Sequence, residues 1–103
     1  MQRPRLHTDE SARLRELLAC PTVPFREEAV AAWVRGRLDA AGVPWFADPA
    51  GNLVVGARTP AGYRRRLAQR TREPLRLLVA HMDHPGFHAT RRLGPRRLAV
   101  RWH

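Results

Sequence analysis

Lysine is absent from this sequence of 103 residues, and it has only one cysteine and few aromatic residues. No apolar run approaches the roughly 20 residues that a membrane-spanning helix needs. The first residues carry no apolar segment of the kind found in secretory signal peptides. The single cysteine, Cys20, cannot form an internal disulfide, and its leucine neighbours indicate a small buried hydrophobe. These absences predict a soluble, cytoplasmic chain with no membrane partner.

Acidic residues are also few: the chain has nine of them and 19 arginines, so its formal net charge is +10. The excess lies entirely in residues 58–103, because residues 1–57 carry seven arginines and seven acidic residues. Such asymmetry is typical of a nucleic-acid-binding module, which is the alternative function that the sequence leaves open. A GC-rich genome also replaces lysine by arginine without any selection for phosphate contacts. Charge alone therefore makes nucleic acid the less favoured partner.

Helical periodicity and capping residues predict two helices in the first half of the chain. Thr8 suits the N-cap of the first helix, with acidic residues directly after it, and Pro21 ends that helix. The second helix begins near Glu27 and ends before Gly42, which suits the position after a helix C-terminus. Its apolar residues recur at spacings of three and four, so we expect one buried face.

Strand patterns follow the second helix. Residues 44–47 and 52–56 flank an Asp-Pro-Ala-Gly turn and predict a hairpin, and residues 58–74 predict a surface connection with one weak helical turn. Leu75–Ala80 is nearly all apolar, the pattern of a central strand buried on both faces of an α/β sheet. Residues 97–103 alternate and predict a half-buried strand. Because too few elements follow residue 80 to cover a central strand, we expect the chain to be the front part of a longer domain.

A candidate site follows the predicted central strand. His81 and Asp83 are two residues apart, so an extended backbone would place both side chains on one side. A metal-bound imidazole commonly donates its other N–H to a carboxylate, and His-x-Asp supplies both groups. Catalytic zinc needs three protein ligands, and His84 and His88 lie close enough in sequence to be considered. A hydrogen-bonded pair at a surface turn remains the alternative interpretation.

Three motifs occur in the order found at the start of a known enzyme family. They are LLACPTVPFREEAVAAWVRGRLDAAGV, PWFADPAGNLVVGAR and LRLLVAHMDHPGF, which together run from about Leu17 to about Phe87. This part of the chain resembles the co-catalytic zinc peptidases, that is, the glutamyl and deblocking aminopeptidases and their carboxypeptidase relatives. Asp48, Gly51 and Asn52 match the family's Asp-x-x-Gly-Asn turn. The chain departs from the family at His84-Pro85, where relatives usually carry an acidic or small residue.

The resemblance implies an α/β fold, namely the N-terminal part of a phosphorylase/hydrolase-like zinc peptidase domain with two helices, a hairpin and a central buried strand. Residues 1–90 would belong to the catalytic domain, and residues 91–103 would start an inserted β domain. His81 would bind one of two zinc or other divalent ions, and Asp83 would be the catalytic-site residue that holds the imidazole. The implied activity is metal-dependent hydrolysis of a peptide or amide bond.

The same resemblance limits what these 103 residues can do. The family's bridging Asp, its paired Glu residues and its other ligands have no match in the chain. We therefore expect the 103 residues alone to bind metal weakly and to be inactive on peptides. The peptide substrate would bind only to the intact protein, and exposed faces would favour homo-oligomers.

Overall fold

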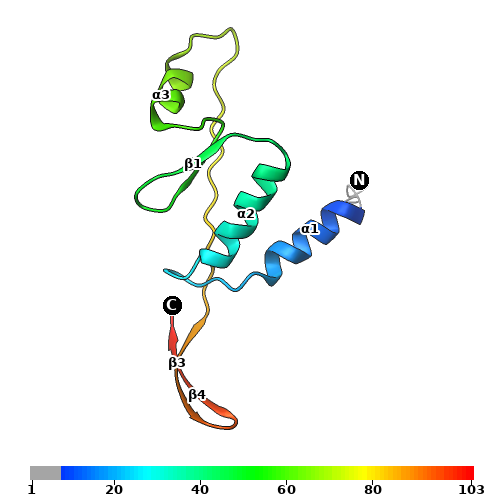
Figure 1. Cartoon of the computed structure of the whole chain (residues 1–103), viewed down its shortest axis with the longest axis vertical. Coiled ribbons are helices and arrows are strands. Elements are labelled where there is room, and N and C mark those ends of the chain that lie inside the picture. The colour runs from blue at the N-terminus through cyan, green and yellow to red at the C-terminus, as the bar shows by residue number, and fades with distance from the viewer. Residues whose placement is uncertain (1–7) are drawn as a thin grey trace, which may run out of the picture. The chain divides into compact units, whose positions relative to one another are not determined.

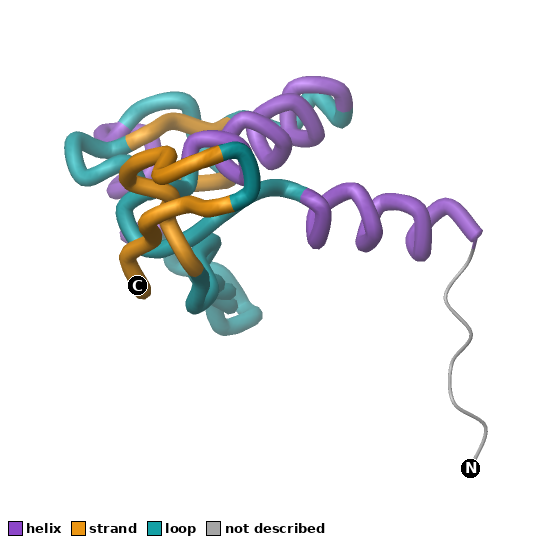
Figure 2. Tube along the Cα trace, turned by 90° about the horizontal axis from the view of Figure 1, so that it is seen from below, coloured by secondary structure: helices purple, strands orange, loops and turns teal. Residues whose placement is uncertain are grey.

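A computed structural model of the chain describes residues 8–103 (Figure 1). In chain order, these residues form α1 (Thr8–Ala19), α2 (Glu28–Ala40), β1 (Trp45–Ala47), β2 (Leu53–Val55), α3 (Pro60–Ala68), β3 (Phe87–Gly94) and β4 (Arg97–Trp102). The strands, orange in Figure 2, pair as two antiparallel hairpins, β1 with β2 and β3 with β4. The chain is therefore a small α/β protein. No helix within residues 8–103 is long and apolar enough to cross a membrane.

Two compact units divide the chain. The first unit consists of the described residues up to Trp33 together with Met82–His103, and the second unit is Val34–His81. Among the described residues, each unit buries one hydrophobic side chain, Val30 in the first and Ala57 in the second. Neither unit therefore contains an extensive apolar core.

Contacts between distant parts of the sequence define the first unit. The hydroxyl of buried Thr22 donates to the carbonyl of Met82 at 3.0 Å, which joins two segments sixty residues apart. A Cβ at Gly86 would lie 2.5 Å from Cγ1 of Val23, so the backbone passes too close for any larger residue. Cys20, expected to be buried, is only partly buried, and its Sγ lies 3.5 Å from the carbonyl of Glu16.

The end of α2 confirms the predicted cap. Gly42 has a φ of 65°, a conformation in which glycine avoids the strain of a Cβ. The Val43 N–H donates to the Leu38 carbonyl at 2.9 Å, and the Gly42 N–H donates to the Asp39 carbonyl at 3.0 Å. This pair of bonds satisfies carbonyls that the last helical turn would otherwise leave without partners.

The β1–β2 hairpin is also confirmed, with Phe46 paired to Val54. The Asp48 and Asn52 backbones pair across the turn, and Gly51 takes a φ of 88° between them. Phe46 contacts Tyr63 of α3 edge to face, with ring centroids 6.3 Å apart.

Helix α3 corrects the prediction of a surface connection with one weak turn. It has nine residues, and the Thr59 side chain accepts a hydrogen bond from the Gly62 N–H at 3.0 Å. Pro60 occupies the first turn, where its missing N–H costs nothing. The Thr-Pro pair is therefore a start signal that outweighs the arginine-rich composition of the segment.

The predicted central buried strand is not formed within residues 8–103. Leu75–Ala80 has no regular secondary structure, and Leu78 and Val79 are 95% and 88% exposed. A strand buried on both faces needs neighbouring strands at its edges and helices over its faces. Within residues 8–103 the two sheets are β1–β2 and β3–β4, and neither includes Leu75–Ala80, so the segment has no neighbouring strand.

The β3–β4 hairpin begins at Phe87. Leu98, Val100 and Trp102, expected to be half-buried, are each more than half exposed, because no second layer covers that face in the described chain. The assignment of residues 91–103 to an inserted domain stays a prediction.

Candidate functional site

His81 and Asp83 lie in the irregular segment before β3. His81 is exposed and is the last residue of the second unit, whereas Asp83 is partly buried and belongs to the first unit. The extended strand that would set both side chains on one side is not formed. The metal-binding role of His81 and the catalytic-site role of Asp83 therefore stay predictions.

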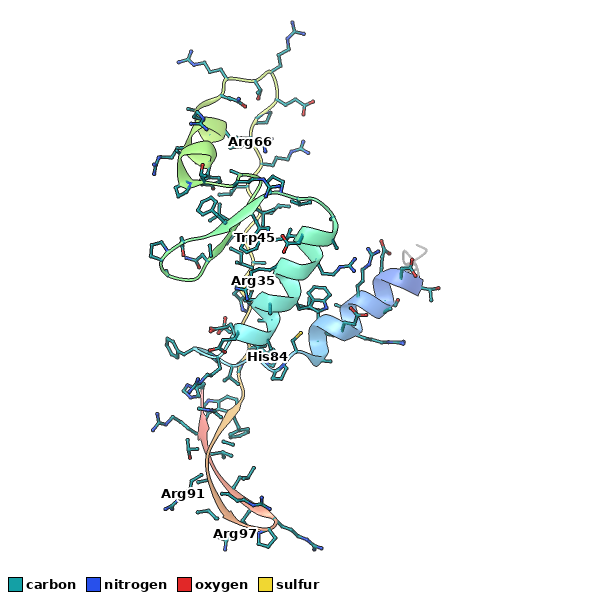
Figure 3. The ribbon with its side chains drawn as sticks, viewed as in Figure 1. Arg35, Trp45, Arg66, His84, Arg91 and Arg97 are labelled. Atoms are coloured by element: carbon teal, nitrogen blue, oxygen red, sulfur yellow. The ribbon has the colours of Figure 1, made fainter. Side chains whose placement is uncertain are left out.

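The nearby histidines make separate contacts. His84, labelled in Figure 3, is exposed, and its Nδ1 lies 3.2 Å from the Pro85 carbonyl oxygen. His88 is partly buried on β3, and its ring centroid lies 6.2 Å from that of His103.

A site for a divalent metal ion requires several His, Cys, Asp or Glu side chains close together. Within residues 8–103, no three or more His, Cys, Asp or Glu side chains form a group that could hold a metal ion. Catalytic zinc sites use three protein ligands. The side chains described here do not form such a site by themselves, and zinc as a cofactor stays a prediction.

Asp48 has a structural role in the turn that matches the family motif. Its Oδ1 accepts from the Asn52 backbone N–H and its Oδ2 accepts from the Asn52 side-chain amide, both at 2.8 Å. These bonds favour the ionised carboxylate, chiefly the bond from the Asn52 side chain, and they lower the pKa of Asp48 below its ordinary value of 3.8. Both carboxylate oxygens are thus used to fix the turn.

One feature beside the β3–β4 hairpin was not anticipated from the sequence. Phe25 has a φ of 68°, unusual for a bulky residue, and its side chain is 84% exposed. Arg91 and Arg97, labelled in Figure 3, extend outward from the hairpin. The Gly94-Pro95 pair between two arginine pairs is the signal that could have located the turn. No local signal predicts the left-handed conformation at Phe25.

Comparisons of the chain with protein-family models, with curated proteins and with solved structures found no significant match. The resemblance to zinc peptidases therefore depends on the three sequence motifs.

Proposed function

We propose that this chain is the N-terminal portion of a metal-dependent, aminopeptidase-like hydrolase. The proposal is supported by the three motifs in family order, two of which contain well-defined local features. These are the capped helix α2, Glu28–Ala40, and the turn built on Asp48 and Asn52.

The exposed segment Leu75–Ala80 carries the proposal. Exposing four consecutive apolar residues is costly, and the full burial of one leucine or valine side chain is worth about 1.5–3 kcal/mol. Leu77, Leu78 and Val79 are all mainly exposed and belong to no sheet. A sequence of this kind is suited to a central strand whose neighbours come from the rest of a larger domain.

His81 and Asp83 have distinct proposed roles in that larger domain. When bound, the metal would polarise the scissile carbonyl and lower the pKa of a water molecule. His81 would be one ligand, and Asp83 would be the catalytic-site residue that holds the imidazole in one tautomer. Since the other donors are not among residues 8–103, no hydrolysis is proposed for this chain alone. A single cysteine fits a reducing compartment, and we place the hydrolase in the cytoplasm.

The first test is the reading frame beyond the codon for His103. We expect it to continue into a sequence with a further Asp, a Glu-Glu pair and a further His. A stop codon with no downstream remnant of these motifs would refute the proposal of a larger hydrolase.

The second test is the activity of that longer protein on an aminoacyl p-nitroanilide in the presence of Zn²⁺. His81→Ala should abolish hydrolysis because a metal ligand is lost, and Asp83→Asn should reduce it about 10- to 100-fold, as expected for a partner of a metal ligand. His84→Ala is the matched control and should retain activity. Full activity of the His81→Ala protein would exclude the proposed role of His81.

A further inference from the structure

Strand pairing gives the β3–β4 hairpin two different faces. Cross-strand partners share a face of a hairpin. The pairs His88–Arg101, Arg91–Ala99 and Gly94–Arg97 lie on one side, and they alternate along the hairpin with the pairs on the opposite side. We call the side of these three pairs the basic face, and its charged side chains are Arg91, Arg97 and Arg101. The opposite side carries Phe87, Ala89, Val100 and Trp102, together with the pair Arg92–Leu98.

A register shift is what places Arg91 on the basic face. Ala89 pairs with Val100, and the next pair is Arg91 with Ala99. Strand β3 therefore has one extra residue between these two pairs, and the pairing register shifts there by one residue. Without this shift, Arg91 would lie on the side of Ala89 and Phe87. Bulges of this kind redirect side chains, and here the result is three arginines on one side.

Aromatic rings continue the basic face at the open end of the hairpin. His103 pairs with Gly86 through both backbone hydrogen bonds, which extends the ladder beyond β4. Its ring centroid lies 6.2 Å from that of His88 and 6.4 Å from that of Phe25. Phe25 is 84% exposed, so one face of its ring is open to a ligand.

The charge of this region is uncompensated within its own sequence. Residues 84–103 contain five arginines and no Asp or Glu, and all five arginines are exposed. At the aromatic end, the Oε1 atom of Glu27 accepts the Phe25 N–H at 3.0 Å. That bond holds the Phe25 backbone, and the hairpin itself carries no carboxylate.

We propose that the basic face binds single-stranded nucleic acid. Arg91, Arg97 and Arg101 contact successive phosphates, because guanidinium groups donate paired hydrogen bonds to phosphate oxygens. Phe25 and His103 stack on an unpaired base at the open end. Rings beside an arginine row favour a nucleic acid over an acidic peptide, and stacking on an exposed ring requires a base that is not in a duplex. This function is independent of the proposed hydrolase.

Fluorescence anisotropy of a labelled dT₂₀ oligonucleotide, titrated with the whole chain, tests the proposal. We expect binding at 50 mM NaCl that weakens as salt rises. The triple variant Arg91→Gln/Arg97→Gln/Arg101→Gln should bind at least about 10-fold more weakly. Its log–log salt slope should be shallower by about 2, since each phosphate contact with a single strand contributes about 0.7.

The matched control removes the same three charges from the second unit. Arg64, Arg65 and Arg70 are exposed on α3 and just after it, and their triple substitution by Gln should change affinity less than about 3-fold. Phe25→Gly should weaken binding several-fold without changing the salt slope. Glycine adopts a φ of 68° freely, so this variant removes the ring and keeps the backbone. Circular dichroism should be unchanged for all three variants.

Four results would overturn the proposal. They are no binding at 50 mM NaCl, an equal loss of affinity in the control variant, equal affinity for a duplex of the same length, and equally effective competition by poly-glutamate at the same charge concentration. The first excludes a site, the second indicates net charge alone, the third excludes stacking, and the fourth indicates an acidic protein surface as the partner.

Discussion

Asp48 and Asn52 illustrate how two side chains can determine a turn at the surface. Each carboxylate oxygen of Asp48 accepts one hydrogen bond from Asn52, and Gly51 supplies the positive φ that the turn requires. These residues lie between strands of three residues each, which have little pairing of their own. The hairpin therefore depends on its turn more than on its strands.

Asn52→Ala should raise the pKa of Asp48 towards 3.8, because the largest cause of its lowering is the Asn52 side-chain amide. The folded-state pKa is lowered, so the carboxylate stabilises the hairpin above about pH 3.8, and this contribution is lost as the pH falls through the lower, folded-state value. Carboxyl carbon chemical shifts followed by NMR titration measure both effects. An unchanged Asp48 pKa in the variant would contradict this role of Asn52.

At the scale of elements, alanine substitutions of the two glycines in and after α2 should change the free energy of unfolding in opposite directions. Gly36 lies inside the helix and Gly42 follows it with a φ of 65°, and a Cβ at either position would have nothing within 4 Å. Gly36→Ala should stabilise the chain by about 0.5–1 kcal/mol, because glycine is a poor helix former. Gly42→Ala should destabilise it by about 1–2 kcal/mol, because alanine is strained in the left-handed region.

Urea denaturation followed by circular dichroism measures both free energies of unfolding. Each variant serves as the control for the other, since the same methyl group is added in open space. Stabilisation by both substitutions would show that Gly42 does not need its left-handed conformation.

Elements with local signals could be predicted from the sequence, and those that depend on distant partners could not. The end of α2 follows from Gly42 and the β1–β2 turn from Asp48 and Asn52, all within a few residues. Leu75–Ala80 has the composition of a strand, but strand formation needs neighbours that composition does not reveal. The predicted proximity of His81 and Asp83 was argued from that strand, and it stays a prediction. On the hairpin, the register shift at Arg91 depends on pairing with β4, so the basic face was not predictable either.

At the scale of the whole molecule, large apolar side chains in the described part of the chain are more often exposed than buried. Val30 and Ala57 form the buried hydrophobic set within residues 8–103. Leu77, Leu78 and Val79 are mainly exposed in a segment with strand-like sequence and no strand partner. Such segments pair readily with other chains, so this stretch is the expected site of self-association.

Leu78→Ser/Val79→Ser should reduce concentration-dependent association without lowering the free energy of unfolding by more than about 0.5 kcal/mol, as expected of exposed positions. Sedimentation velocity over a range of concentrations measures the association. Leu14→Ser/Leu18→Ser alters two exposed leucines of α1 and should have a smaller effect. A loss of stability of several kcal/mol in the first variant would show that Leu78 and Val79 are buried in the chain.

The hydrogen bond from Thr22 to Met82 also has a consequence for the order in which the chain folds during its synthesis. The second unit, Val34–His81, is continuous, whereas the first unit combines the residues up to Trp33 with Met82–His103. Ribosomes add about 5–20 residues per second, so Met82–His103 is made during roughly one to four seconds after the second unit is complete. Because Val34–His81 also emerges from the ribosome before Met82–His103, the second unit can fold while Thr22 still lacks its partner, Met82.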